Sequence, residues 1–494
     1  MAELRKSDYS NEDLRPTRAE ERTWSAYNMA SLWIGMSVCI PTYTLASGLI
    51  AAGMNWWQAV LTIVLGNAIV LVPMILNAHA GTRYGVPYPV FARLWFGTKG
   101  AHIPSLMRAI VAAGWFGIQT WIGGSALDAL LSSLWSGWAN IPLHLPIAFL
   151  AFWALNVWIG YKGPEAIRSL ESWGAPLLLA LGLCLLVWAY KAAGGFGPML
   201  SAPSKFKTTG EFLAVFFPAL TGMIGFWSTL ALNIPDFSRY AKSQKAQILG
   251  QIMGLPTTMG LFSFIGVAVT SATVVVFGEA IWDPVVLLSK FPPLVVTMGT
   301  VGIVLATITT NIAANVVAPA RAIENLFPRK FTFGLGAIVT GIIGIAMQPW
   351  ALLANYAAYI FGWLGTYAAF LGPLDGVAIA DYWLVRQKKI DLVDLYQASG
   401  RYHYSKGINL RAIIALGLGI LVALSGRFIP ALGFLTDNAW IVGLFVSAAS
   451  YWYLMRGHGS VLSDEEFRAI TDLKKTTETV SQTAEVALEG LEGR

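Results

Sequence analysis

The sequence predicts an all-α integral membrane protein of about twelve transmembrane helices, and three observations lead to this fold class. Hydrophobic residues make up 56% of the 494 residues and charged residues only 12%, a composition that excludes an ordinary soluble globule. Apolar segments of about 20 residues, enough to cross a bilayer core about 30 Å thick, recur along the whole chain. Lys and Arg are concentrated in alternate connecting segments.

The apolar segments give twelve predicted spans, at residues 29–50, 56–78, 103–134, 143–161, 172–190, 211–234, 250–276, 294–318, 333–347, 352–384, 410–428 and 438–456. The first ten are interpreted as two sets of five that form inverted repeats. The predicted organisation is a cytoplasmic N-terminal arm (1–28), a first five-helix repeat (29–190), a second, inverted repeat (211–384), helices eleven and twelve (410–456) and a mobile cytoplasmic tail (457–494).

The positive charges predict the orientation of the chain. With a cytoplasmic N-terminus, the outward segments receive only five of the 33 Lys and Arg residues, namely Lys191, Lys205, Lys207, Lys290 and Arg427. This asymmetry follows the positive-inside rule and predicts a multi-pass protein of the cell membrane with both termini in the cytoplasm. The net charge of +6 is therefore interpreted as a consequence of membrane orientation. It is not interpreted as a sign of nucleic-acid binding, because no basic stripe is present.

Several kinds of chemistry are excluded by what the sequence lacks. The two cysteines, Cys39 and Cys184, both fall in predicted spans, and the five histidines are far apart. Neither a disulfide framework nor a Cys/His metal site is expected. No phosphate-binding glycine loop, nucleophile elbow or paired carboxylate motif occurs. We therefore expect neither an enzyme nor a bound cofactor.

Two predicted spans carry interruptions. The first has Pro41 near its centre, where proline removes a backbone donor and clashes with the preceding turn. The sixth has Gly222 and Gly225 just before Trp227. Each interruption alone is equally consistent with a simple kink, because membrane helices tolerate Pro and Gly. Their matching positions in the two repeats favour two broken helices that meet at a binding site in mid-membrane.

The third span supplies aromatic and amide groups. Trp115 and Gln119 are one turn apart on one helix face, and Trp227 could provide a second aromatic plate. This set suits a flat heterocycle with N–H and C=O edges. Asp128 falls on roughly the opposite face of the span from Gln119, so it is interpreted as a packing or outer-end polar residue.

The eighth span carries three threonines and two asparagines near its middle, and lipid cannot satisfy these polar groups. At about 100° per residue, Asn311 and Asn315 lie within about 40° of each other, while Ala306, Thr309 and Thr310 group on another side. The amides suit an organic ligand, and the hydroxyls with freed carbonyls suit a small hard cation. The alternative for each threonine is a bond back to its own helix.

Six short stretches then resemble the nucleobase:cation symporter-1 family, which includes hydantoin, cytosine, uracil and allantoin permeases. They are NAHAGTRYG (77–85), WFGIQT (115–120), NIPDF (233–237), NIAAN (311–315), LGPL (371–374) and DYW (381–383). The resemblance covers nearly the whole chain, and residues 14–16, 23–24 and 40–43 look most like the allantoin permease branch. It implies a twelve-helix fold with two inverted five-helix repeats and alternating access.

The resemblance also implies site residues. Those that it assigns to an aromatic sandwich, to hydrogen bonds and to a cover over the substrate are Trp115, Gln119, Trp227, Asn311, Asn315 and Leu364. Those that it assigns to a sodium ion, through carbonyls and hydroxyls, are Gly35, Val38, Ala306, Thr309 and Thr310. Two positions depart from some members, because Cys39 replaces a glutamine and Phe226 a glycine. Both departures argue against a hydantoin-like substrate and leave allantoin or a nucleobase open.

The sequence therefore predicts a symporter that imports a ureide or nucleobase, with allantoin as the first candidate, driven by a cation gradient. The main alternative is proton coupling through Asp375 or Asp236, with the threonines structural. Asp375, which the family resemblance does not predict, is interpreted either as this proton group or as a carboxylate paired near the cytoplasmic end. A channel or a non-transporting substrate sensor is the alternative from another class of protein.

Overall fold

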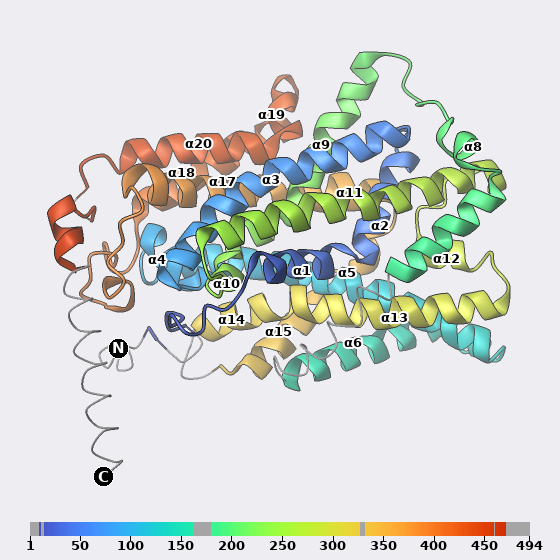
Figure 1. Cartoon of the computed structure of the whole chain (residues 1–494), viewed down its shortest axis with the longest axis horizontal. Coiled ribbons are helices and arrows are strands. Elements are labelled where there is room, and N and C mark those ends of the chain that lie inside the picture. The colour runs from blue at the N-terminus through green and yellow to red at the C-terminus, as the bar shows by residue number, and fades with distance from the viewer. Residues whose placement is uncertain (1–8, 11–13, 163–178, 327–330, 459, 471–494) are drawn as a thin grey trace, which may run out of the picture.

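The computed structural model describes residues 9–10, 14–162, 179–326, 331–458 and 460–470. They form a bundle of long helices that run roughly along its longest axis (Figure 1). Over these residues the only β-type pairings are the isolated bridges Trp24–Ala241 and Ser405–Ile408. Seven of the described helices are long and apolar enough to cross a membrane, or nine if each of two bent helix pairs is one span. The predicted all-α membrane fold is confirmed.

The first half of the chain forms the helices of predicted spans one to five and their connections. Their bounds are α1 (Ala26–Ser37), α2 (Ile40–Ala51), α3 (Trp56–Tyr84), α4 (Tyr88–Phe96), α5 (His102–Leu134), η2 (Trp138–Asn140), α6 (His144–Lys162), an unlabelled helix at Leu179–Ala192, and α8 (Phe196–Leu200). The start of predicted span five, residues 172–178, lies outside the described residues.

The second half continues the same pattern. Spans six to ten correspond to α9 (Thr209–Asn233), α10 (Pro235–Ser238), α11 (Gln244–Phe277), α12 (Pro284–Leu288), α13 (Pro293–Asn315), α14 (Val317–Leu326), α15 (Phe333–Ala346), α16 (Pro349–Leu352), the π-helix η3 (Ala358–Leu364), α17 (Gly365–Ile379) and the π-helix η4 (Ala380–Val385). The rest of the chain forms η5 (Asp394–Tyr396), α18 (Leu410–Leu424), η6 (Ser425–Arg427), η7 (Pro430–Leu432), α19 (Gly433–Asp437) and α20 (Ala439–Leu454). Each predicted span overlaps one of these helices or two or more consecutive ones, up to the four elements from α16 to η4 for span ten, and the repeat boundaries stay a prediction.

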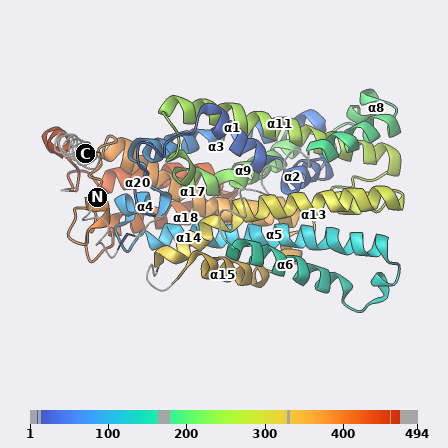
Figure 2. The same cartoon turned by 60° about the horizontal axis from the view of Figure 1, so that its bottom comes forward.

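The long helices pack as two groups. In one group α3 contacts α9 and α11, and α11 also contacts α1 and α2. In the other, α5 contacts α6, α13 and α15, and Figure 2 shows these helices side by side. A separate apolar cluster that includes Phe116, Phe152 and Ile312 fills the second group. The main apolar cluster contains residues of both groups, among them Trp115 of α5 and Ala306 of α13.

The first span is broken where proline predicted a break. The axes of α1 and α2 differ by 60°, and Val38 and Cys39 between them leave the helical conformation. Pro41 lies in the first turn of α2, where a backbone amide has no acceptor within the helix, so the amide that proline lacks is not missed. Within the described chain, no backbone amide beyond the break bonds to the carbonyls of Gly35 or Val38. These two oxygens are therefore available to another partner.

The sixth span corrects the prediction, because α9 is continuous from Thr209 to Asn233. The predicted break at Gly222 and Gly225 is wrong. These glycines instead permit close packing: a Cβ at Gly222 would lie 3.1 Å from the Ile360 carbonyl oxygen, and one at Gly225 would lie 2.9 Å from that of Leu364. The missing side chains let the start of span ten approach the backbone of α9.

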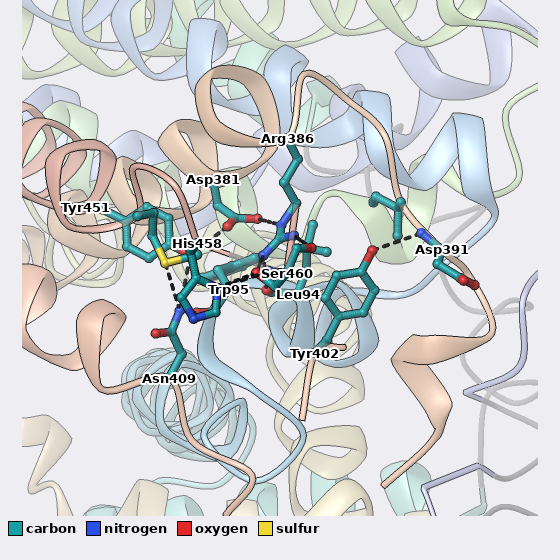
Figure 3. Close-up of polar contacts among 12 residues, drawn as sticks. Leu94, Trp95, Asp381, Arg386, Asp391, Tyr402, Asn409, Tyr451, His458 and Ser460 are labelled. Carbon is teal, nitrogen blue, oxygen red and sulfur yellow. Dashed lines mark hydrogen bonds and ion pairs between the residues drawn. The ribbon is translucent and has the colours of Figure 1, made fainter. Parts of the chain in front are cut away.

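A buried ion pair fixes the far end of span ten (Figure 3). The Arg386 Nε lies 2.8 Å from the Asp381 Oδ2, and both side chains are 0% exposed. The Tyr451 hydroxyl donates to Asp381 at 2.6 Å, and Arg386 Nη1 donates to the Ser460 carbonyl at 2.6 Å. Arg386 Nη2 also donates to the Leu94 carbonyl at 3.3 Å. This network joins η4 to α4, α20 and the segment after α20.

The described N-terminal and C-terminal segments meet the same end of the bundle. The Trp24 amide donates to the Tyr240 carbonyl at 2.8 Å, beside α10, and Arg239 donates to the Arg15 carbonyl at 3.1 Å. Ser460 is held at this end by Arg386. In Figure 1 this is the end that carries α4, α10 and α14. The arrangement agrees with an even number of spans.

Candidate functional site

A small cavity lies between the two helix groups, beside the break in the first span. Its volume is about 30 Å³, and it is lined by Met36, Cys39, Pro41, Trp115, Gln119, Phe226, Trp227, Thr229, Leu230, Thr310, Ala314 and Asn315. One water molecule needs about 10–15 Å³ on this measure. The space therefore suits about two water molecules, and a ring of nucleobase size enters only if lining side chains move.

Two of the predicted site residues, Trp115 and Trp227, form aromatic walls of this cavity, but they do not face each other directly. The Phe226 ring lies 5.1 Å from that of Trp115 and 5.0 Å from that of Trp227, edge-to-face with both. Trp227 also meets Trp33 edge-to-face at 5.2 Å. Phe226, which the sequence singled out as a departure, therefore contacts both predicted plates and must turn aside to admit a ring between them.

Two buried polar atoms at the cavity have no protein partner. The Gln119 side chain is 4% exposed and that of Trp227 is 4% exposed. The Gln119 Oε1 and the Trp227 Nε1 make no hydrogen bond within the described chain. Buried polar atoms are normally paired, and leaving one unpaired costs about 1–3 kcal/mol. An acceptor and a donor left open at one cavity are suited to a ligand with complementary edges.

The two asparagines of the eighth span have different positions. Asn315 lines the cavity, and its Nδ2 donates to the Asn311 Oδ1 at 3.0 Å. Asn311 is 0% exposed and does not line the cavity. Its Nδ2 lies 3.1 Å from the Thr120 Oγ1 and 3.3 Å from both the Phe116 carbonyl and the Asn156 Oδ1. Asn311 thus ties α13 to α5 and α6 and orients Asn315.

Leu364, predicted to cover the ligand, does not line the cavity. It is fully buried, and its backbone carbonyl lies against Gly225 of α9. Span ten approaches the site instead through Tyr367, whose hydroxyl accepts from the Trp115 Nε1 at 3.3 Å. Trp363 meets Trp115 edge-to-face at 6.4 Å. Sequence reasoning missed both residues, although two aromatics close to Leu364 were a usable signal.

The residues predicted to hold a cation are brought close only in part. Thr310 lines the cavity together with Met36 and Cys39 of the broken span. The carbonyls of Gly35 and Val38 are those freed at the break, and Ala306 is buried on α13. The side chain of Thr309 lies outside the described residues. No group of three His, Cys, Asp or Glu that could hold a metal occurs in the described ranges.

A second, larger cavity adjoins the first. It has a volume of about 180 Å³ and shares Met36, Leu230 and Ala314 with it. Its other lining residues are Trp24, Arg108, Asn233, Asp236, Phe237, Tyr240, Val317, Ala318 and Arg321. These residues lie toward the end with α10 and α14, so the small cavity is continued toward that end. We call this space the inner vestibule.

The acidic residues named from the sequence have distinct surroundings. Asp236 lines the inner vestibule and accepts from the Tyr88 amide at 2.8 Å and from Asn233 at 3.2 Å. Asp128 accepts from Trp138 at 2.9 Å and lies 2.7 Å from His144, in the last two turns of α5. These contacts fit a polar residue near a helix end, and whether that end is the outer one stays a prediction. Asp375 is buried away from both cavities.

Known proteins resemble this chain over nearly all its length. Residues 16–443 match a family described as permease for cytosine/purines, uracil, thiamine, allantoin. The chain is 48% identical over 469 residues to the purine-uracil permease NCS1 of Arabidopsis thaliana, covering 90% of this chain and 78% of that protein. It is 43% identical over 459 residues to the allantoin permease of Bacillus subtilis, covering 91% and 94%. The fold matches the inward facing conformation of Mhp1 with a TM-score of 0.80 and 27% identity, covering 94% of this chain and 97% of that one.

Proposed function

Because the chain belongs to this family of permeases for cytosine and purines, uracil, thiamine and allantoin, the nucleobase:cation symporter-1 family, we propose that it is a secondary active symporter. It imports a planar ureide or nucleobase together with a cation, by alternating access. The purine-uracil and allantoin permeases that it resembles support this substrate class. Allantoin is the first candidate, and uracil or a purine is the second.

One observation carries the proposal: two buried polar atoms without a partner in the described chain belong to residues that line a cavity with aromatic walls at the junction of two helix groups. The Gln119 Oε1 can accept from a ring N–H, and the Trp227 Nε1 can donate to a ring C=O. Asn315, oriented by Asn311, offers a further amide. A planar ring with alternating N–H and C=O groups would satisfy all three, and Trp115 would stack on one of its faces.

The cation is proposed to bind between the broken first span and α13. The freed carbonyls of Gly35 and Val38, with the carbonyl of Ala306 and the hydroxyls of Thr309 and Thr310, would provide oxygen ligands for a sodium ion. Binding there would join the two helix groups beside the substrate cavity. Linkage then requires the ion and the substrate to strengthen each other's binding by the same factor.

The two cavities support alternating access. The inner vestibule continues the substrate cavity toward the end that carries α10 and α14. Its walls come from both helix groups, because Asp236 belongs to the α9–α10 side while Arg108 and Arg321 belong to α5 and α14. Movement of one group against the other would close this space. The likeness to an inward facing transporter supports the same interpretation.

The cell membrane is the proposed location, with both termini in the cytoplasm. The positive-inside rule places the loops that hold most Lys and Arg in the cytoplasm. These loops include the segments next to α4, α10 and α14, so the inner vestibule opens to the cytoplasm. The proposed partners are the small-molecule substrate, the coupling cation and the lipid bilayer, and no nucleic acid.

Uptake of radiolabelled allantoin and uracil into proteoliposomes tests the proposal. We expect accumulation above the external concentration under an inward cation gradient, and competition among planar ureides and nucleobases. Separate Na⁺ and H⁺ gradients identify the driving ion. Uptake that only equilibrates would indicate a channel, and binding without uptake would indicate a sensor. Uptake that is indifferent to Na⁺ would refute the sodium assignment.

A further inference from the structure

A buried carboxyl group in span ten has no role in the proposed substrate or sodium sites. Asp375 of α17 is 0% exposed. Its Oδ1 accepts from the Asn77 Nδ2 at 3.0 Å, and the same Nδ2 donates to the Ala231 carbonyl at 2.9 Å. Its Oδ2 has no partner in the described chain. One neutral amide is thus the whole hydrogen-bonding environment of this carboxyl group.

The elements around Asp375 supply no positive partner in direct contact. Helix α3 presents Asn77, and α9 presents only the Ala231 carbonyl. Helix α4 presents the Tyr88 hydroxyl, which is itself buried without a partner. Helices α18 and α20 present no charged side chain toward it, and Tyr451 of α20 is bonded to Asp381 instead.

Tyr88 connects this buried group to the inner vestibule. Its side chain is an electrostatic neighbour of Asp375 on one side, and of Arg108 of α5 and Asp236 of α10 on the other. Its backbone amide donates to Asp236 at 2.8 Å. Arg108 and Asp236 line the vestibule, so Tyr88 interacts both with the buried carboxyl group and with charged groups of the vestibule.

An ionised carboxylate in this position is costly. Removing such an ion from water carries a large desolvation penalty even after the protein relaxes, and one amide hydrogen bond offsets only part of it. Protonation removes the charge and turns the unpaired Oδ2 into a hydroxyl donor. The buried, unpaired geometry therefore favours the neutral acid, whereas a conformation that exposes the group to water favours its release of a proton.

We propose that Asp375 binds one proton from the outer solution and releases it to the cytoplasm in each transport cycle. This inference rests on the proposed symport and adds a proton to its coupling. The step is a transfer from Asp375–COOH to water, which gives a carboxylate and a hydronium ion, and it is reversed on the outer side. Tyr367, two turns earlier on α17, holds Trp115 at the substrate cavity, so movement of one helix links the two events.

Proton movement can be measured directly in proteoliposomes that contain a trapped pH-sensitive dye. Substrate uptake by the wild-type protein should acidify the lumen, with about one proton per substrate molecule. Asp375→Asn, which mimics the neutral acid, should abolish this acidification and, when a proton gradient is the only driving force, reduce the accumulation ratio to about 1. Asp128→Asn, an acid in a membrane helix far from the vestibule, is the matched control and should acidify the lumen like the wild type.

A second measurement does not depend on transport. The infrared C=O stretching band of a protonated carboxyl group should be present in the purified wild-type protein at neutral pH and absent from Asp375→Asn. Asp375→Glu should retain the band, and the pH profile of its uptake should be shifted relative to that of the wild type. Uptake without acidification, together with no band lost in Asp375→Asn, would overturn the inference and leave the symport proposal standing. Absence of any uptake would count against the proposed function, while the band would still report on Asp375.

Discussion

Replacing Asn315 and Asn311 separately by alanine should show which of the two asparagines contributes mainly to ligand binding and which mainly to folding stability. Asn315 lines the cavity, and the one hydrogen bond that its side chain makes within the described residues is donated to Asn311. In Asn315→Ala a bound ring loses one buried partner, which costs about 1–3 kcal/mol. Since about 1.4 kcal/mol is a factor of ten, the dissociation constant should rise by about 5- to 140-fold. The free energy of unfolding should fall by about 1–3 kcal/mol, because the buried Asn311 Oδ1 loses this donor.

Asn311→Ala should lower folding stability more than it weakens ligand binding. Its side chain holds the Asn156 Oδ1 and the Asn315 Nδ2 in a fully buried network. Truncation leaves these two groups without that partner, at about 1–3 kcal/mol each, so the free energy of unfolding should fall by roughly 2–6 kcal/mol. Binding should weaken only because Asn315 is less well oriented.

Tryptophan-fluorescence titration in detergent measures binding of allantoin and uracil, and the thermal midpoint by scanning fluorimetry measures stability. The expected result is weak binding with a modestly lowered midpoint for Asn315→Ala, and a more strongly lowered midpoint for Asn311→Ala. Wild-type affinity in Asn315→Ala would show that the cavity is not the substrate site. A wild-type midpoint in Asn311→Ala would refute the structural role of the buried network.

Three further predictions concern other parts of the molecule. Phe226→Gly removes the ring between the two indoles, so competition assays should show gained affinity for hydantoins with bulky ring substituents. Arg386→Met leaves the buried Asp381 carboxylate without its charged partner, so the free energy of unfolding should fall by about 3–5 kcal/mol. The Arg15 guanidinium lowers the pKa of the Glu21 carboxyl from 4.5 to about 2. The stability difference between wild type and Glu21→Gln should therefore be complete above pH 4.5 and disappear as the pH falls toward 2.

Each of these three predictions has a result that would contradict it. Unchanged selectivity in Phe226→Gly would mean that this ring does not limit the cavity. Lys389→Met breaks a pair with the exposed Asp464 and should cost much less stability than Arg386→Met, because solvent screens an exposed pair. A loss as large as that of Arg386→Met would remove the distinction between buried and exposed pairs. A stability difference for Glu21→Gln that persists at pH 2 would contradict the assigned ion pair.

The spans and much of the cavity lining were predictable because both follow from local rules. Hydrophobic length marks a helix that crosses lipid, and polar residues inside such a helix must avoid lipid. Trp115, Gln119 and Asn315 followed from helical spacing alone and lie together at the cavity. Pro41 predicted the break in the first span for the same reason, since its effect on the helix is local.

The remaining features depend on partners that are distant in sequence. Gly222 and Gly225 look identical in sequence whether they break a helix or admit a neighbour, and only the position of span ten distinguishes the two. Asn311 satisfies its amide with Thr120 and Asn156 of other helices. No periodicity in one span reveals that arrangement.

The central claim is that the cavity between the broken first span, α5, α9 and α13 holds the transported ring. Cys39 lines this cavity, and Cys184 is the only other cysteine in the chain. In a Cys184→Ser background, the rate at which a small maleimide alkylates Cys39 can be followed by mass spectrometry. A saturating concentration of the transported compound should slow this alkylation. An unchanged rate, with a compound that the same protein accumulates, would contradict the claim.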